Sequence, residues 1–169
     1  TSMKAIVLGS VQPRSEPLEH LTISSCLECN ESILEDILLE SYEGSLDCPA
    51  IHGVREIRDI VAGHKSVHGH DPNLWSIAEW RGKTSGVLLL NPVPEERCMD
   101  LTYLGVAPHA RGKGVGDALM CTAFNQSKEC GLKVLSLAVD AQNIPAITLY
   151  KRWNFQENGQ RFTMIHKLC

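Results

Sequence analysis

Several common sequence features are missing from this chain of 169 residues. Its uncharged apolar runs fall far short of the roughly 20 residues needed to cross a membrane, and no charged-then-apolar signal segment precedes a small-residue cleavage site. No basic, aromatic-rich stripe is present, and the formal net charge is −4. Internal repeats, low-complexity tracts and linkers are also lacking. We therefore expect no membrane span and no nucleic-acid partner.

Size and composition indicate what the chain can build. A hydrophobic content of 43% with 21% charged residues is ordinary for a globular protein. The length suffices for one core but is short for two, so we expect a single domain over residues 20–169. Residues 1–19 are expected to form an extended lead-in, in which Thr1-Ser2 resembles a cloning remnant. The seven cysteines are an odd number, which favours a reducing, cytoplasmic location.

Hydrophobic periodicity predicts an alternation of helices and strands. The expected helices are residues 30–42, 54–62, 115–130 and 143–154. The expected strands are residues 21–24, 74–80, 85–91, 99–106, 134–139 and 162–168. Ser32 and Glu35 have the spacing of a capping box for the first helix, and Asn158-Gly159 is expected to form a tight turn before the last strand. This order predicts an α/β or α+β fold, with a mixed, largely antiparallel sheet of roughly six to seven strands flanked by about four helices.

The most informative stretch is Arg111-Gly112-Lys113-Gly114-Val115-Gly116, which lies between a strand pattern and a helix pattern. Glycines let an anion approach the main-chain N–H groups at the positive end of a helix dipole, and Arg111 and Lys113 add positive charge. The turn therefore predicts a phosphate cradle. Two other phosphate loops do not fit, because Asp117 stands where the dinucleotide fingerprint needs its third glycine, and Ile77 where a nucleotide-hydrolase loop needs its first.

Residues 106–116 follow the pattern V-x-P-x-x-R-G-x-G-x-G, which resembles the acyl-CoA pyrophosphate loop of the GCN5-related N-acetyltransferases. A second block at residues 143–155 is similar to that family's N-x-x-A-x-x-L-Y-x-x-x-G-F segment, with Asn154 in place of the usual glycine. Asparagine is the residue next most able to adopt a left-handed conformation at a helix end, so we expect the turn to survive. The resemblance covers approximately residues 20–169. It implies an acyl-CoA N-acyltransferase (GNAT) fold, with acetyl-CoA bound where strands 99–106 and 134–139 part, and no metal.

The resemblance also implies roles for individual residues. The pyrophosphate is expected at the glycine turn, and the pantetheine arm along the main chain of residues 104–106 with a contact from Asn143. Tyr150 is expected beside the thioester sulfur as general acid, with plain core packing against Trp153 as the alternative. The expected cofactor-binding residues are Leu104, Gly105, Val106, Arg111, Gly112, Lys113, Gly114, Val115, Gly116, Asn143 and Tyr150.

A proton acceptor is also required, because an amine with a pKa of about 10.4 is charged at neutral pH and cannot attack. Asp100 resembles the position at which several family members keep a catalytic glutamate; it would act through a water, or it is simply a charge at the start of a strand. Glu79 on the neighbouring strand is the second candidate base. An acyl-cysteine route through Cys98 or Cys121 is less favoured, because no motif places a histidine to activate either thiol.

These patterns together predict an acyl-CoA-dependent N-acetyltransferase that transfers an acetyl group from acetyl-CoA to a primary amine of a small molecule or peptide by direct attack. The alternatives are a non-catalytic acyl-CoA sensor or regulatory module, and a different nucleotide binder. Residues 42–70 are the expected acceptor side, where Glu43 and Asp47 either indicate a cationic acceptor or form a hydrated loop. His64, His68 and His70 are interpreted as a solvated loop in preference to a metal site. The sequence leaves the oligomeric state open, a homodimer included.

Overall fold

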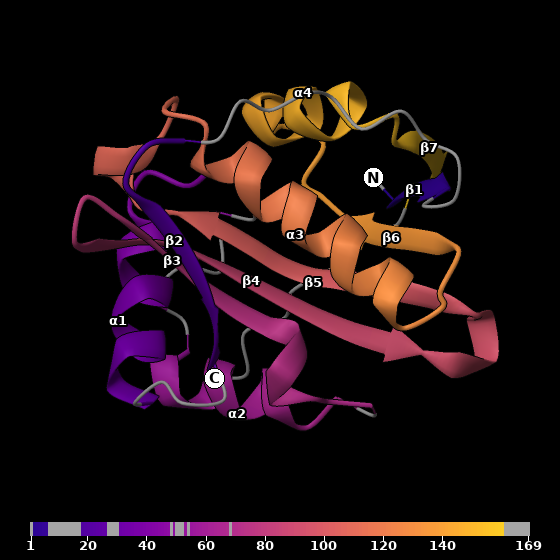
Figure 1. Cartoon of the computed structure of the whole chain (residues 1–169), viewed down its shortest axis with the longest axis horizontal. Coiled ribbons are helices and arrows are strands. Elements are labelled where there is room, and N and C mark those ends of the chain that lie inside the picture. The colour runs from indigo at the N-terminus through magenta and orange to yellow at the C-terminus, as the bar shows by residue number, and fades with distance from the viewer. Residues whose placement is uncertain are drawn as a thin grey trace, which may run out of the picture.

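The computed structural model describes residues 2–6, 18–26, 31–47, 49, 53, 55–67 and 69–160. The strands are β1 (Ser2–Ile6), β2 (Leu21–Ser25), β3 (Trp75–Trp80), β4 (Lys83–Val93), β5 (Cys98–Val106), β6 (Val134–Ala138) and β7 (Gln156–Gly159). The α-helices are α1 (Glu31–Tyr42), α2 (Ile57–Lys65), α3 (Val115–Glu129) and α4 (Ile144–Arg152). The strands form one seven-stranded sheet in the order β2-β3-β4-β5-β6-β1-β7, with helices on both faces (Figure 1). The predicted mixed, mostly antiparallel α/β fold is confirmed.

Two apolar layers hold the helices against the sheet. Val87 and Leu89 of β4 pack in a cluster with the inner face of α1, whereas Leu88 and Leu90 pack in the cluster that includes α3. A strand that is buried on both faces needs apolar residues at successive positions, which explains the unbroken run in β4. Among the described residues, no helix combines the length and the apolarity needed to span a bilayer.

The central feature of the sheet is the point at which β5 and β6 part. These two strands are parallel, and they pair only between Cys98–Leu101 and Val134–Leu137. β5 continues to Val106 paired with β4 on its other side. Within the described residues, the β6-facing edge of residues 102–106 is therefore without a strand partner. The parting of the two strands that the sequence suggested is confirmed.

A bulge interrupts the pairing of β5 with β4. Leu89 lies opposite Tyr103 and Leu90 opposite Leu101, which leaves Thr102 as an extra residue. A bulge of this kind reverses which alternate side chains face each side of the sheet. Leu101 accordingly packs in the α3 core, and after the bulge it is Leu104 that packs against the same core.

Some predicted helix boundaries and faces were wrong. Ser32 lies inside α1, so it cannot be the N-cap of a capping box. The apolar side chain of Ile33 is 40% exposed and does not belong to the buried face. The observed stripe is Leu34, Ile37, Leu38 and Ser41, a spacing that keeps one helix face toward the sheet. The second helix begins three residues later than expected, at Ile57, and contains Gly63.

Both ends of the chain also differ from expectation. Ser2–Ile6 was expected to belong to a lead-in outside the domain, yet it forms β1, antiparallel to both β6 and β7. Asn158-Gly159 lies in β7 instead of forming a turn. The partner of these strands is far away in sequence, so a local pattern cannot reveal the pairing. The strand expected at residues 162–168 lies outside the described residues.

The last helix begins and ends as predicted. Asn143 is the N-cap of α4, and its side-chain oxygen accepts the N–H of Ala146 at 3.3 Å. Pro145 lies in the first turn, where its missing N–H costs no helical hydrogen bond. Asn154 has a φ of 59°, which confirms the left-handed conformation expected where the resemblance has glycine.

Candidate active site

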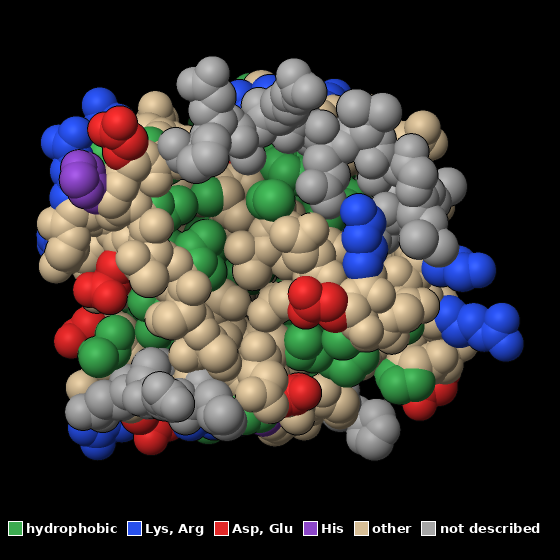
Figure 2. Space-filling model, in the orientation of Figure 1, with side chains coloured by type: hydrophobic (Ala, Val, Ile, Leu, Met, Phe, Trp, Pro, Cys, Tyr) green, Lys and Arg blue, Asp and Glu red, His purple; other side chains and the backbone are tan. Residues whose placement is uncertain are grey.

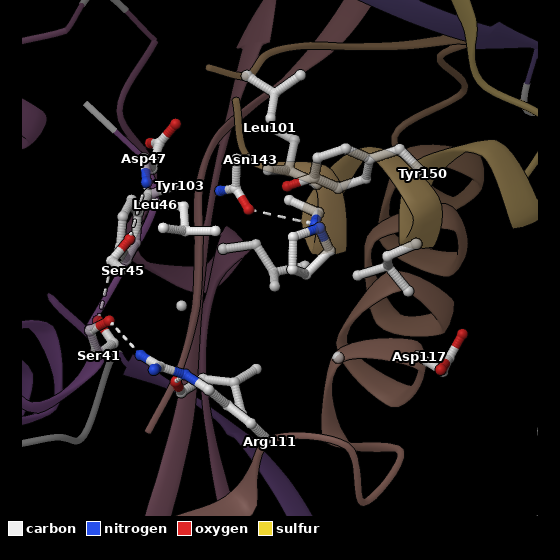
Figure 3. A pocket seen from close by; sticks show the side chains of 18 of the residues that line it. Ser41, Ser45, Leu46, Asp47, Leu101, Tyr103, Arg111, Asp117, Asn143 and Tyr150 are labelled. Carbon is white, nitrogen blue, oxygen red and sulfur yellow. Dashed lines mark hydrogen bonds between the residues drawn. The ribbon is translucent and has the colours of Figure 1, made fainter. Parts of the chain in front are cut away.

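A cavity of about 540 Å³ opens where β5 and β6 part (Figure 3). We call one side of it the turn wall, formed by Leu104–Val106, by Gly112, Gly114 and Gly116, and by residues at and near the start of α4. The opposite side is the α1 wall, formed by Ser41 and Gly44–Asp47 at the end of α1. Both walls belong to a single continuous cavity.

The glycine turn contributes main chain to the cavity. Gly112, Gly114 and Gly116 line it, and Gly112 and Gly114 have φ values of 69° and 94°. A Cβ added at either of these two would meet no atom within 4 Å. Crowding by the protein is therefore not the reason for glycine at these positions; the reasons are the positive φ and the room that a ligand needs. Gly114 is also the N-cap of α3, whose first N–H groups have no partner within the helix. These features fit the pyrophosphate of coenzyme A.

The other residues of the turn have different surroundings. Lys113 is exposed and is not among the cavity-lining residues, and the Val115 side chain is buried in the α3 core. Arg111 does line the cavity, but its guanidinium donates to the carbonyl oxygens of Val106 and Ser41, at 3.0 Å each. Arg111 thus connects the turn wall to the α1 wall while keeping its positive charge beside the glycines.

Leu104, Gly105 and Val106 line the cavity along the unpaired edge of β5. An exposed strand edge can pair with an extended ligand as an added strand does, which fits the amide-containing pantetheine arm. Gly105 also allows close packing of α1, because a Cβ there would lie 2.6 Å from Ser41 Oγ and 2.7 Å from Tyr103 Cε1. Glycine at this position is therefore needed for the α1 wall to approach β5.

Tyr150 and Asn143 lie on the α4 side of the same cavity. Tyr150 is 6% exposed and packs against Phe155, with ring centroids 5.6 Å apart. Its hydroxyl points away from α4 into the cavity (Figure 3). Burial, with a smaller contribution from the charge of Asp47, raises the pKa of Tyr150 above its ordinary value. The phenol is therefore neutral, a hydrogen-bond donor that packs in the core and still faces the cavity.

The structure does not bring Asp100 or Glu79 to the cavity. Neither residue is part of its lining. Asp100 accepts hydrogen bonds from Thr102 and Ser136, at 3.2 Å each. It stands six residues before Val106, which in a regular strand would put both side chains on one face, but the bulge at Thr102 reverses the alternation. Glu79 is exposed on β3, and β4 lies between it and β5.

Sequence reasoning missed a tyrosine in the cavity. Tyr103 lines the cavity, and its hydroxyl lies 2.8 Å from Ser41 Oγ. Ser41 donates its only hydroxyl proton to the carbonyl of Leu38, so Tyr103 is the donor to Ser41. Burial raises the pKa of Tyr103, which keeps it a donor. Ser41 and Tyr103 are 62 residues apart, and no local pattern points to their contact.

Two histidines of the segment expected to be a solvated loop are half-buried, His64 in the last turn of α2 and His70, although most of the described residues between them are exposed. The His70 ring lies 4.4 Å from the Trp75 ring, and the His64 ring lies 6.5 Å from Trp75 and 6.3 Å from Tyr103. Burial lowers the pKa of His64. His68 is outside the described residues. Within the residues that the structure describes, no group of three or more His, Cys, Asp or Glu side chains is arranged to hold a metal ion.

The parted strands, the glycine turn and the inward-facing tyrosine define a protein of the acyl-CoA N-acyltransferase fold. The chain belongs to the Acetyltransferase (GNAT) family, whose model matches residues 32–155.

Individual relatives match shorter stretches. The chain is 34% identical over 85 residues to mycothiol acetyltransferase of Streptomyces griseus, a match that covers 50% of this chain and 28% of that protein. It is 28% identical over 116 residues to N-acetyltransferase family 8 member 2 of Rattus norvegicus, covering 66% and 50%. The chain thus spans half or less of the length of these curated relatives.

Solved structures share the fold at low sequence identity. A GCN5-related N-acetyltransferase from Sphaerobacter thermophilus superposes with a TM-score of 0.71 at 21% identity, covering 92% of this chain and 47% of that one. The ribosomal-protein-S18-alanine N-acetyltransferase from Escherichia coli superposes with a TM-score of 0.62 at 22% identity, covering 82% and 79%. At these identities the likeness shows the fold alone.

Proposed function

We propose that this protein is an acetyl-CoA-dependent N-acetyltransferase that acts on a primary amine of a small molecule or peptide by direct attack. One observation carries the proposal: the glycine turn, the open edge of β5 and the Tyr150 hydroxyl all line the same cavity. Membership of the GNAT family and the names of the relatives support it. A cytoplasmic location is part of the proposal and rests on the odd number of cysteines.

In this proposal each part of the turn wall has one task. The main chain of residues 112–116, with the positive charge of Arg111, holds the pyrophosphate at the N-terminus of α3. Residues 104–106 pair with the pantetheine arm, and Asn143 lies beside it at the start of α4. Acetyl-CoA supplies the activated acetyl group as co-substrate, and the protein supplies its position.

Tyr150 then acts as general acid. The amine nitrogen forms a bond to the acetyl carbon while the carbon–sulfur bond breaks, and the Tyr150 hydroxyl gives its proton to the departing thiolate. The nitrogen, now part of the amide, loses a proton that restores the phenol. The phenol has a proton to give, because burial raises its pKa and keeps it protonated at neutral pH.

A second candidate function is an acyl-CoA sensor that binds the thioester without turning it over. One observation favours it, namely that neither of the two carboxylates expected to act as bases lies in the cavity lining. The two functions differ in whether an amine releases coenzyme A.

The test is release of free thiol from acetyl-CoA with a panel of primary amines, for the wild type and for Tyr150→Phe. We expect Tyr150→Phe to lower kcat by about 100-fold or more, since a positioned general acid contributes roughly that much. Tyr103→Phe is the matched comparison, because its hydroxyl faces the same cavity but is already bonded to Ser41, and we expect the smaller loss there. Binding of acetyl-CoA without turnover by any amine would favour the sensor.

A further inference from the structure

The α1 wall carries a carboxylate that the catalytic scheme above does not use. Asp47 lies in the segment that follows α1, lines the cavity and is half-buried. Figure 3 shows it across the cavity from Tyr150, whose hydroxyl points toward that side. The cavity therefore has a proton donor on one wall and a carboxylate on the other.

Two hydrogen bonds hold Asp47 in place. Its Oδ1 accepts the N–H of Asp140 at 3.1 Å, a contact between residues 93 apart in the sequence. Its own N–H donates to Ser45 Oγ at 3.1 Å. The first bond ties the segment after α1 to the end of β6, at the mouth of the parted strands. A carboxylate can accept about four hydrogen bonds, so one that is held by the protein can also bind a ligand.

The remaining charges in the lining are committed elsewhere. Asp117 receives both a hydrogen bond from Trp153 and an ion pair from Arg152, with the shortest Arg152 contact at 2.8 Å. Arg111 is bonded to the two carbonyl oxygens described above. Among the described residues of the α1 wall, Asp47 is the one ionisable side chain.

The groups facing Asp47 come from four elements. Its charge contributes to raising the pKa of Tyr42 on α1, of Tyr103 on β5 and of Tyr150 on α4, although burial is the larger cause for all three. Asp140, beside the end of β6, reaches it through its main-chain N–H. All three tyrosines are neutral, so the field on this side of the cavity is negative and favours a cation.

We propose that Asp47 binds the ammonium group of the acceptor and takes the proton that this group must lose before it attacks. The proposal deepens the proposed function and rests on it. One N–H bond of the ammonium breaks and one O–H bond forms on Asp47, which leaves a neutral amine and a neutral acid; the acid returns its proton to solvent when the product leaves.

Two exposed apolar side chains, one in the cavity lining and one next to it, indicate the class of acceptor. Leu46 is 48% exposed and lines the cavity next to Asp47, and Ile144 is 61% exposed next to the lining residues Asn143 and Pro145. An acceptor with an apolar body and a single ammonium group satisfies both features. A carboxylate beside the nitrogen, as in a free amino acid, would be repelled by Asp47, so we infer a cationic amine without an adjacent carboxylate.

Asp47→Asn tests the role of the charge. The amide oxygen can still accept the N–H of Asp140, so the fold is retained while the charge and the basicity are lost. Glu43→Gln is the control, because it makes the same kind of change in an exposed residue of the same segment that does not line the cavity. With phenethylamine as probe, we expect Asp47→Asn to lower kcat/KM about 100-fold or more at pH 7, and Glu43→Gln to change it less than about twofold.

The pH profile separates proton transfer from structural support. The Asp47→Asn variant depends on amine that is already neutral, so its kcat/KM rises about tenfold per pH unit toward the amine pKa near 10, whereas the wild-type profile is flatter.

A second experiment compares phenethylamine with phenylalanine, which differs from it by one carboxylate, and we expect the wild type to prefer phenethylamine. Parallel pH profiles, or equal use of the two probes, would overturn the inference while leaving acetyl transfer intact. Absence of turnover with every amine would instead overturn the proposed function, and the inference with it.

Discussion

The two walls of the cavity are built in different ways. The turn wall consists largely of main chain from one short stretch, residues 104–116, in which glycines and a helix N-terminus provide the binding groups. The α1 wall consists of side chains whose positions depend on residues far away in the sequence, as in the contacts of Ser41 with Tyr103 and of Asp47 with Asp140. A ligand that is common to the whole family can be held by a wall of the first kind, which is made of main chain from one short stretch. We infer that the second kind selects the acceptor.

The charges of the molecule follow the same division. Figure 2 shows basic and acidic side chains interspersed over one face of the molecule. Within the cavity, by contrast, the two signs lie on different walls. Positive charge from Arg111 lies at the glycine turn, and negative charge from Asp47 lies on the α1 wall. The comparison therefore predicts that changes in the turn wall abolish cofactor binding, whereas changes in the α1 wall or its supports have smaller and more selective effects.

The largest effect is expected from Gly114→Glu. This residue has a φ of 94° and lies on the cavity, so glutamate would place a side chain and a negative charge where the pyrophosphate is expected. We expect acetyl-CoA binding, measured by isothermal titration calorimetry, to be lost. The backbone strain of a side chain at such a φ is roughly 1–2 kcal/mol, which should leave the protein folded.

Gly82→Glu is the matched control for this variant. Gly82 has a φ of 74° and lies in the turn between β3 and β4. A Cβ added at Gly82 would meet no atom within 4 Å, as is also true at Gly114. The two variants share the strain and the charge and differ only in their distance from the cavity. If both bound acetyl-CoA as the wild type does, the assignment of the turn wall would fail.

The turn wall was predictable because its determinants are contiguous. The spacing of the glycines after Pro108 predicted the turn, and the parted strands and the left-handed Asn154 were found where the resemblance put them. A helix N-terminus preceded by glycines can be predicted from the local sequence, without any knowledge of tertiary contacts.

The α1 wall was predicted much less well. The sequence does not separate Asp47 from Glu43, and leaves open whether the two indicate a cationic acceptor or a hydrated loop, because nothing local reveals that the Asp47 carboxylate accepts the N–H of Asp140. Asp100 was a candidate base through its resemblance to a position in the family, but it lies in the part of β5 that still pairs with β6, outside the cavity lining. Register shifts and pairings between distant segments, such as β1 with β6 and β7, depend on the assembled sheet. Such shifts and pairings cannot be predicted from the local sequence pattern.

An intermediate effect is expected from Gly105→Ala, which tests how closely the two walls are joined. The added methyl group would approach Ser41 Oγ to 2.6 Å and Ser41 Cβ to 2.8 Å, so α1 must move away from β5. Overpacking of this kind costs about 1–3 kcal/mol. In urea unfolding we expect a loss in that range, and in kinetics a larger increase in KM for the amine than for acetyl-CoA.

A double variant decides whether Ser41 is the cause. Ser41→Gly removes both Ser41 atoms and leaves the contact with Tyr103 Cε1. The loss of stability in Gly105→Ala with Ser41→Gly should therefore be smaller than the sum of the two single losses. Additive losses would mean that the approach of α1 to Gly105 does not limit the packing.

The smallest effect is expected from Glu40→Gln at the outer edge of the junction. Glu40 Oε1 accepts from Lys83 Nζ at 2.9 Å and lies 3.1 Å from His109 Nδ1, so it links α1 to the β3–β4 turn and to the segment before the glycines. The hydrogen bond from Lys83 is the main cause that lowers the pKa of Glu40. A carboxyl with a lowered folded-state pKa contributes stability above its unfolded value, near 4.3, and loses that contribution as the pH falls through the folded-state value.

The Lys83 side chain is 59% exposed and that of Glu40 is 31% exposed, so solvent screens the pair and its contribution should not exceed about 1 kcal/mol. We expect urea unfolding to show that difference between the wild type and Glu40→Gln at pH 7. The difference should shrink as the pH falls below the unfolded value, and it should vanish once the carboxyl is protonated in the folded state as well. Glu35→Gln on the same helix, whose contact with Arg58 is 3.9 Å, should show less. If the difference in unfolding free energy persisted at low pH, Glu40 would act through packing contacts. The two walls would then be held together at this edge by packing and not by charge.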